Sequence, residues 1–346
     1  MARNGELLAH MTSADMARDL DLLRAAVGDE RLTYIGQSYG TLLGATYASL
    51  FPGRARALVL ADPVDTDTWT NRPFEAFREQ SASFEYLLDR FFAACAAHQA
   101  ACGFGGEDPE SAFELTLESL DRAPVSMTGP PGTVDGDDAR LAAVQAMLSP
   151  RDRPRLAASL ASAQADDGTG LRQLADEYYA REPDGTSPLI DSQWATLSVD
   201  QDYPHAVAPF LAAGRHAASL FPHAFGNSGY SELAFGLSPV RRRPFRGPFV
   251  NSSKSGTALV IGMTHDPNTP YAWAKRLTAD LGNARLLTLR GDGHDILSSL
   301  NPCILGQALL YLEDGTLPPV GATCQREPPF GSYGNVAHRR CRPCHR

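Results

Sequence analysis

The sequence predicts an α/β fold in which helices flank a parallel sheet and a large helical lid interrupts the core. Near each end of the chain, short β-favouring apolar runs alternate with helical patterns, as is typical of parallel sheets. Mostly helical patterns fill the chain between them. We therefore expect a first core part at 1–66, a lid at 67–250, a second core part at 251–320 and a tail at 321–346.

The first core part contains two strand-like runs and two helical patterns. In chain order, we expect a helix at 12–28, a strand at 32–35, a helix at 39–51 and a strand at 57–60. Thr12 and Asp15 resemble a capping box that begins the first helix, and Gly28 ends it. The second helix carries apolar residues at three- and four-residue spacings until Pro52 stops it.

A pentapeptide of the form G-x-S-x-G joins the strand at 32–35 to the helix that follows it. In this pentapeptide, Gly36 and Gly40 flank Ser38. A serine at such a tight turn is exposed at the carboxyl end of the sheet, and the glycines avoid clashes with the neighbouring backbone. The backbone N–H of Tyr39 would hold the anion that forms when the serine attacks a carbonyl. Ser38 is therefore the candidate nucleophile, and Tyr39 is the candidate oxyanion donor.

The second core part carries the imidazole and the carboxylate that a serine nucleophile needs. We expect a strand at 257–262, a helix at 271–281, a strand at 284–289 and a helix at 303–312. Asp266 follows the first of these strands, and His294 follows the second. The order Ser, Asp, His on loops after strands is that of the α/β-hydrolases, which predicts a triad of Ser38, Asp266 and His294. The D-x-x-T-P pattern also puts the hydroxyl of Thr269 near Asp266.

Two other interpretations of these residues stay open. Asp62 and Asp65 follow the strand at 57–60 and are alternative sources of the acid. A metal site is the second alternative, formed by His265, Asp266, His294 and Asp295. Because these four residues lack the tight spacing of metal ligands, we expect no metal and no cofactor.

Composition narrows the choice of partners. The chain has 346 residues, of which 43% are hydrophobic, and a formal net charge of −9. This charge argues against nucleic acid, since phosphate-binding proteins usually carry the opposite sign. The sequence contains no run of about eighteen apolar residues, so it predicts no membrane span. Residues 1–6 lack the apolar stretch of a signal peptide. We expect a peptide or another small molecule as the partner.

Five stretches of the chain resemble the tripeptidyl aminopeptidase family of actinobacteria, which is related to the proline iminopeptidases within the α/β-hydrolases. These stretches are 12–20, 34–41, 266–270, 291–294 and 301–303, and the likeness runs from about residue 12 to residue 324. The resemblance implies a serine exopeptidase that removes short peptides from free N-termini. A small-ester or amide hydrolase with the same triad is the alternative activity, and an inactive fragment is the alternative to both.

The resemblance also bears on the cysteines and on location. It implies disulfides between Cys95 and Cys102 and between Cys303 and Cys324, which fit an exported protein. Free buried thiols are the alternative. Members of the family are usually secreted, whereas the lack of a signal peptide predicts a cytoplasmic protein if the chain begins at its true start.

Recognition of a free N-terminus needs a carboxylate in the lid that faces the nucleophile. Asp200 lines up with an acidic lid position of the family, and Asp202 and Glu177 are the alternatives. Beyond the likeness, Cys341 and Cys344 belong to a C-x-x-C-H sequence of the kind that attaches haem. We expect a disordered or out-of-frame tail there rather than a haem or zinc site.

The resemblance further implies a missing segment. The fold normally has four strands before the helix at 12–28, and the loop after the third carries a glycine-rich oxyanion donor. With neither in this sequence, the N–H of Tyr39 is the one donor that we can identify. We expect an N-terminally truncated enzyme, poorly soluble and nearly inactive until an upstream segment completes the fold.

Overall fold

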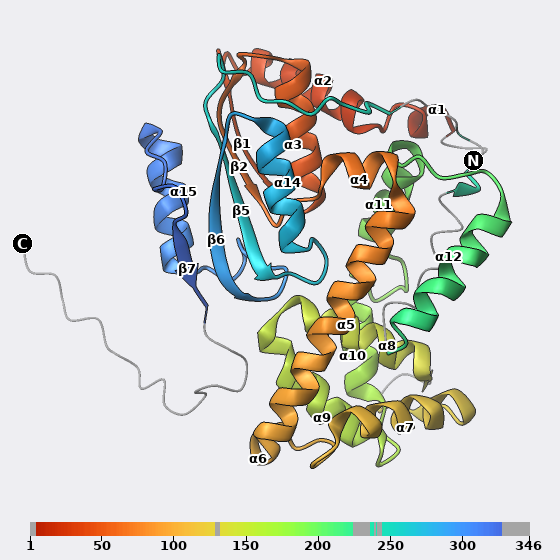
Figure 1. Cartoon of the computed structure of the whole chain (residues 1–346). Coiled ribbons are helices and arrows are strands. Elements are labelled where there is room, and N and C mark those ends of the chain that lie inside the picture. Colours follow the sequence, from red (N-terminus) through yellow and green to blue (C-terminus); the bar gives the residue numbers. More distant parts are fainter. Residues whose placement is uncertain (1–4, 129–131, 224–235, 239, 241–243, 327–346) are drawn as a thin grey trace, which may run out of the picture.

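The core of the protein is a parallel sheet of five strands. A computed structural model describes residues 5–128, 132–223, 236–238, 240 and 244–326 (Figure 1). The strands lie side by side in the order β1-β2-β5-β6-β7, and each pairs in parallel with its neighbours. They are β1 (Leu32–Gln37), β2 (Ala55–Ala61), β5 (Ala258–His265), β6 (Ala284–Asp292) and β7 (Thr323–Gln325).

Helices cover both faces of this sheet (Figure 1). On one face lie α2 (Ser13–Ala26), α3 (Tyr39–Leu50) and α14 (Tyr271–Leu281), and on the other lies α15 (Pro302–Asp314). Successive side chains of a strand point to opposite faces, so Leu58 and Leu60 of β2 join the core beneath α3 and α14, whereas Val59 joins the core beneath α15. Because both faces are buried, the central strands are almost wholly apolar.

The ends of α2 show how the local sequence sets the elements. The hydroxyl of Thr12 accepts a hydrogen bond from the N–H of Asp15 at 3.2 Å and caps the helix. Gly28 follows the helix with a φ of +82°, a conformation that glycine adopts without strain. Every helix and strand that we expected in the two core parts is present, with ends shifted by a few residues.

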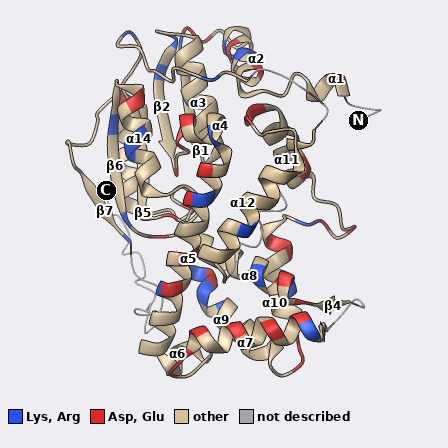
Figure 2. Ribbon diagram, turned by 45° about the vertical axis from the view of Figure 1, so that its right-hand side comes forward, with Lys and Arg blue, Asp and Glu red and all other residues tan. Residues whose placement is uncertain are grey.

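The lid is a helical insertion between β2 and β5. The described helices of the lid are α4 (Thr66–Asn71), α5 (Pro73–Ala97), α6 (Gln99–Cys102), α7 (Pro109–Arg122), α8 (Gly136–Leu148), α9 (Arg153–Ala163), α10 (Thr169–Tyr178), α11 (Pro188–Asp200) and α12 (Val207–Leu220). A further short helix, α1 (Gly5–Leu8), lies at the start of the chain. A short antiparallel ribbon, β3 (Val125–Ser126) and β4 (Thr133–Val134), joins them. The long helix α5 runs from the core into the lid (Figure 1) and carries Phe84, Leu88 and Phe91 into the lid's own apolar core. Acidic residues are prominent along α7 (Figure 2).

Two disulfides join the cysteine pairs that the resemblance implied. Cys95 and Cys102 link α5 to α6 with a Cα–Cα distance of 5.1 Å. Cys303 and Cys324 link α15 to β7 with a Cα–Cα distance of 5.8 Å. The cysteines at 341 and 344 lie outside the described residues. No helix in the described ranges is both long enough and apolar enough to cross a membrane.

Candidate active site

The predicted nucleophile lies in a strained turn between β1 and α3. Ser38 has a φ of +54° and a ψ of −123°, a region that residues other than glycine rarely adopt. Its N–H donates to the carbonyl of Ala61 at 3.0 Å. Its own carbonyl accepts from the N–H of Thr41 at 2.9 Å and from the Thr41 hydroxyl at 2.6 Å. These hydrogen bonds hold the strained backbone in place.

The two glycines of the pentapeptide differ in how strictly the turn requires them. A Cβ at Gly36 would lie 2.5 Å from the carbonyl oxygen of Gly40, so no larger residue fits there. At Gly40 the nearest atom to a Cβ would be the hydroxyl of Tyr34, at 3.3 Å, which is tight but not prohibitive. That hydroxyl donates to the carbonyl of Gly40 at 2.8 Å. Tyr34 therefore braces the turn, a part that its place in the strand did not indicate.

The predicted acid and base form a hydrogen-bonded pair. Nδ1 of His294 lies 3.0 and 3.1 Å from the two carboxylate oxygens of Asp266, which is 1% exposed. The same carboxylate accepts from the N–H groups of Asn268 and Thr269, at 2.8 and 2.7 Å. The structure also brings the Thr269 hydroxyl within 2.8 Å of Asp266 and 3.3 Å of His294 Nδ1. Ser38 and this pair follow parallel strands, so they lie at the same edge of the sheet.

Asp62, one alternative acid, lies in the same cluster. A carboxylate oxygen of Asp62, one of Asp266 and a ring nitrogen of His294 are all within 4.8 Å of one another. Asp62 is fully buried and accepts hydrogen bonds from the Gln37 side chain at 2.7 Å and the Ile296 N–H at 3.0 Å. Burial raises the pKa of Asp62 despite the attraction of His294, and the charge of Asp266 raises it further. The hydrogen bonds of Asp62 are therefore made with Gln37 and Ile296, whereas the carboxylate that is hydrogen-bonded to His294 is that of Asp266.

The other residues of the alternative interpretations have separate partners. Asp65 caps α4 through the N–H of Thr68 and pairs with Arg276. Nδ1 of His265 donates to the carboxylate of Asp292 at 2.8 Å, and Asp295 pairs with Arg326. The four residues of the alternative metal interpretation are therefore not brought together as one set of ligands. The three-residue cluster that does form, Asp62, Asp266 and His294, contains the predicted acid and base themselves.

Asp200 lies beside the nucleophile turn but is closed off. It ends α11 and is 1% exposed. Its carboxylate accepts from the Ser13 N–H at 2.9 and 3.1 Å and from the hydroxyl of Tyr39. Burial raises the pKa of Asp200 to about 6, and burial also raises the pKa of Tyr39. This geometry makes Asp200 a support for the residue after the nucleophile and does not favour an open site for an ammonium group, so that role stays a prediction.

The alternative lid carboxylates are also paired. Asp202 binds Arg246 at 2.6 Å, and Glu177 binds Arg155 at 2.7 Å. The pair of Glu177 and Arg155 lies on α10 and α9, among the lid helices away from the nucleophile turn (Figure 1). Neither carboxylate is free to receive a substrate in this arrangement.

The lid contacts the loops that carry the predicted acid and base directly. From α5, the Ser83 hydroxyl donates to the Asp266 carbonyl at 2.7 Å, and the Gln80 amide donates to the Asn268 carbonyl at 2.6 Å. The N–H of His294 donates to the carbonyl of Leu148, at the end of α8, at 2.7 Å. The sequence carried no local signal for these contacts, because each joins residues that are far apart along the chain.

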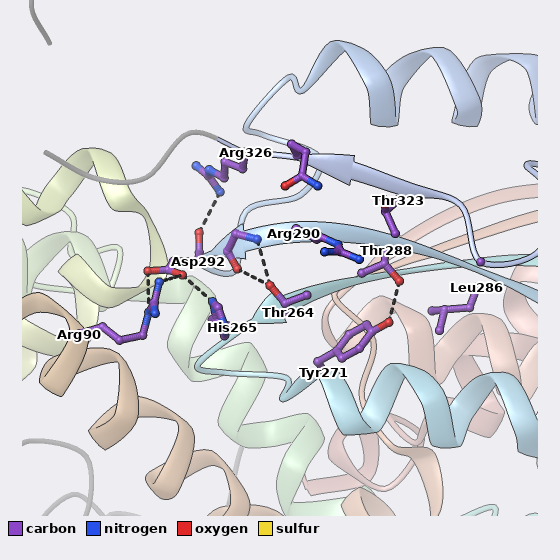
Figure 3. A pocket seen from close by; sticks show the side chains of 13 residues that line it. Arg90, Thr264, His265, Tyr271, Leu286, Thr288, Arg290, Asp292, Thr323 and Arg326 are labelled. Atoms are coloured by element: carbon purple, nitrogen blue, oxygen red, sulfur yellow. Dashed lines mark hydrogen bonds and ion pairs between the residues drawn. The ribbon is translucent and has the colours of Figure 1, made fainter. Parts of the chain in front are cut away.

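A cavity of about 660 Å³ lies next to the acid loop, over β6 and β7 (Figure 3). Its lining includes none of the three predicted triad residues. Asp292 accepts there from Arg90 of α5 at 3.0 Å, from Arg153 of α9 at 2.9 Å and from His265 at 2.8 Å. Burial alone would raise the pKa of Asp292, but these partners hold it well below its usual range. The cavity thus belongs to the junction where the lid is tied to β6.

We expect kcat/KM to rise with pH through the pKa of His294. Burial lowers this pKa, but the charge and the hydrogen bond of Asp266 outweigh burial and raise it from 6.5 to about 9. A general base accepts a proton only in its neutral form, so a raised pKa lowers activity at neutral pH. Rates on a chromogenic ester over about pH 5–10 measure the midpoint. A midpoint at or below 6.5 would contradict the raised pKa of His294.

Two family models and several known proteins match this sequence. The model of the α/β-hydrolase fold matches residues 3–120, and the model of TAP-like proteins matches residues 239–324. The serine protease Hip1 of Mycobacterium tuberculosis is 32% identical over 340 residues, covering 92% of this chain and 62% of Hip1. Carboxylesterase B of the same organism is 31% identical over 325 residues, covering 92% of this chain and 61% of that protein.

A third relative is the tripeptidyl aminopeptidase of Streptomyces lividans. It is 26% identical over 348 residues, covering 93% of this chain and 60% of the relative. This chain therefore spans about three fifths of the length of the curated relatives that it matches. The matched regions include the nucleophile turn, the acid and the histidine. In both core regions the chain is therefore similar to TAP-like α/β-hydrolases.

Proposed function

We propose that this chain carries the catalytic apparatus of a serine hydrolase that releases short peptides from free N-termini. The observation that carries the proposal is the hydrogen-bonded pair of Asp266 and His294, at the sheet edge where Ser38 occupies its strained turn. The relatives support the class of reaction, since one is named a serine protease and another a tripeptidyl aminopeptidase. The two disulfides support an oxidising compartment as its place of work.

The residues take the usual parts of a serine triad. Ser38 attacks the scissile carbonyl while His294 takes the hydroxyl proton, and the N–H of Tyr39 holds the oxyanion. Asp266 keeps the Nδ1–H of His294 oriented and stabilises the imidazolium. The imidazolium then gives its proton to the leaving amine, and water releases the acyl group from Ser38 by the same steps.

A second candidate is a small-ester or amide hydrolase with the same triad. Two observations favour it. Asp200 is occupied by Ser13 and Tyr39 rather than open to an ammonium group, and one relative is named a carboxylesterase. An esterase needs no such anchor, so selectivity for a free N-terminus separates the two candidates.

We expect acetylation of the substrate's N-terminus to lower kcat/KM by about 30-fold. This factor corresponds to about 2 kcal/mol, the loss of one charge-assisted hydrogen bond. The measurement compares a tripeptide p-nitroanilide with its N-acetyl form, with a p-nitrophenyl ester as a control for the triad itself. Equal rates on the two peptides, with the ester still cleaved, would favour the esterase.

The same comparison tests Asp200. If Asp200 receives the ammonium group, Asp200→Asn lowers the preference for the free N-terminus, whereas Asp202→Asn leaves it unchanged. If Asp200 supports Tyr39 alone, Asp200→Asn lowers the rates on both peptides and on the ester by the same factor.

A further inference from the structure

A histidine and four carboxylates, none of them a residue of the predicted triad, meet in the lid. His223 follows α12, Glu85 and Asp89 lie one turn apart on α5, and Glu110 and Glu114 lie one turn apart on α7. Residues four apart on a helix share one face, so each helix presents two carboxylates to the same side.

The ring of His223 is fixed in position. Its side chain is 7% exposed, and its centroid lies 5.5 Å from that of Phe92 and 6.3 Å from that of Phe113. Nδ1 is hydrogen-bonded to the carboxylate of Glu85. A carboxylate accepts only, so Nδ1 carries the proton and Nε2 is the atom that faces the other acids. A carboxylate on one nitrogen of a histidine whose other nitrogen binds a metal is a common arrangement.

Nε2 of His223 is buried and has no hydrogen-bond partner among the described residues. Carboxylate oxygens of Glu110 and Glu114 lie 3.3 and 3.6 Å from it. Ligand atoms of Asp89, Glu110 and His223 lie within 4.8 Å of one another. Two ligands on one tetrahedral zinc ion, with bonds of about 2.1 Å, are about 3.4 Å apart. The separations therefore suit a shared cation.

We propose that His223, Glu110 and Asp89 bind a divalent transition-metal ion, for which Zn²⁺ is the best match to one imidazole and several carboxylates. Glu114 is close enough to add an oxygen ligand, and Glu85 orients the ring. Glu110 and Glu114 are each more than half exposed, so the ion reaches the site from solvent. Bound there, it ties the end of α12 to α5 and α7 and braces the lid.

We expected no metal from the sequence, because the residues of this site lie far apart along the chain. His223 is 138 residues from Glu85 in sequence, and no short ligand motif joins them. A proton is the competing occupant of the site. The hydrogen bond to Glu85 raises the pKa of His223 against the effect of burial, and the charges of Glu85, Glu110 and Glu114 raise it further. An imidazolium would satisfy the acids without a metal.

Titration of the chelator-treated full chain with Zn²⁺ and with Co²⁺ tests the proposal. The protein carries Cys341→Ser and Cys344→Ser so that the tail thiols bind no metal. We expect one Zn²⁺ per chain by calorimetry, Co²⁺ ligand-field bands without thiolate character, and a higher melting temperature with Zn²⁺. His223→Gln and Glu110→Gln should each weaken binding by more than about a hundredfold, and Glu85→Gln by about 10- to 100-fold.

Matched controls are the exposed residues His98 and Glu118, at the end of α5 and on α7. His98→Gln and Glu118→Gln should leave Zn²⁺ affinity unchanged. Glu110→Gln keeps the test decisive if His223→Gln does not fold, because the Glu110 side chain is 54% exposed. Absence of Zn²⁺ binding, or equal binding by the parent and both ligand variants, would overturn the site and leave the imidazolium as its occupant.

Discussion

Replacing Ser38 with alanine should lower kcat by at least about a thousandfold and abolish labelling by an organophosphonate probe. The substitution removes the hydroxyl that forms the acyl-enzyme, and no other group at the turn replaces it. Both serine and alanine carry a Cβ, so the strain of the φ of +54° is similar in the two proteins. Loss of activity would therefore come without loss of the fold, which circular dichroism checks.

The matched control is Ser49→Ala on α3, the helix that follows Ser38, because among the described residues the hydroxyl of Ser49 bonds only to backbone carbonyl and N–H groups. This variant should keep both labelling and turnover. Asp266→Asn and His294→Ala should each lower kcat by several orders of magnitude, and combining either with Ser38→Ala should add little, since the three groups act as a unit. Labelling that survives in Ser38→Ala would refute the assignment of the nucleophile.

Asp292→Asn should lower the free energy of unfolding by about 3–5 kcal/mol, the largest stability effect that we expect from a single substitution. Arg153 is completely buried, and Asp292 is its one ion-pair partner among the described residues. Nε and Nη2 of Arg153 already lack hydrogen-bond partners there. Removing the Asp292 charge leaves a buried guanidinium uncompensated, and the loss is measured as a lower midpoint of urea unfolding at pH 7.

The control for Asp292→Asn is Glu177→Gln, which breaks a pair with Arg155 in which both side chains are 44% exposed. We expect a change of only about 0–1 kcal/mol there. The pKa of Asp292 is depressed in the folded state, so its stabilisation is present at neutral pH and is lost as the pH falls below about 4, the pKa of an unfolded aspartate. Equal destabilisation by the two substitutions would contradict the conclusion that the ion pairs of Asp292 hold the lid to β6.

The core was predictable because its signals are local. The helix α14 has the bounds that its pattern indicated, since Pro270 precedes it and Gly282, with a φ of +69°, follows it. The turn at Ser38 could likewise be predicted from the spacing of its glycines and from the strand and helix on either side. The three-residue strand β7 was missed, because one buried residue between two exposed ones is too short a pattern to distinguish a strand from a loop.

The surroundings of the site were not predictable in the same way. The lid residues that hold the acid loop, Gln80 and Ser83, lie on a helix more than 180 residues away in sequence. Asp200 could be placed in the lid from its neighbours, but its burial against Ser13 depends on how α11 meets the start of α2. Such contacts arise from tertiary packing between segments far apart in sequence, and no local motif in a single sequence predicts them.

The hydrogen bonds from α5 and α8 to the loops of Asp266 and His294 limit how the lid of this protein can be replaced. Exchanging the lid for that of a relative, as a route to new substrates, would also exchange the donors at Gln80 and Ser83 and the acceptor at Leu148. A grafted lid without equivalent donors and acceptor would no longer hold the loops of Asp266 and His294 in position. Small displacements of catalytic groups lower the reaction rate strongly. A change of lid in this protein would therefore change the support of Asp266 and His294 together with the substrate site.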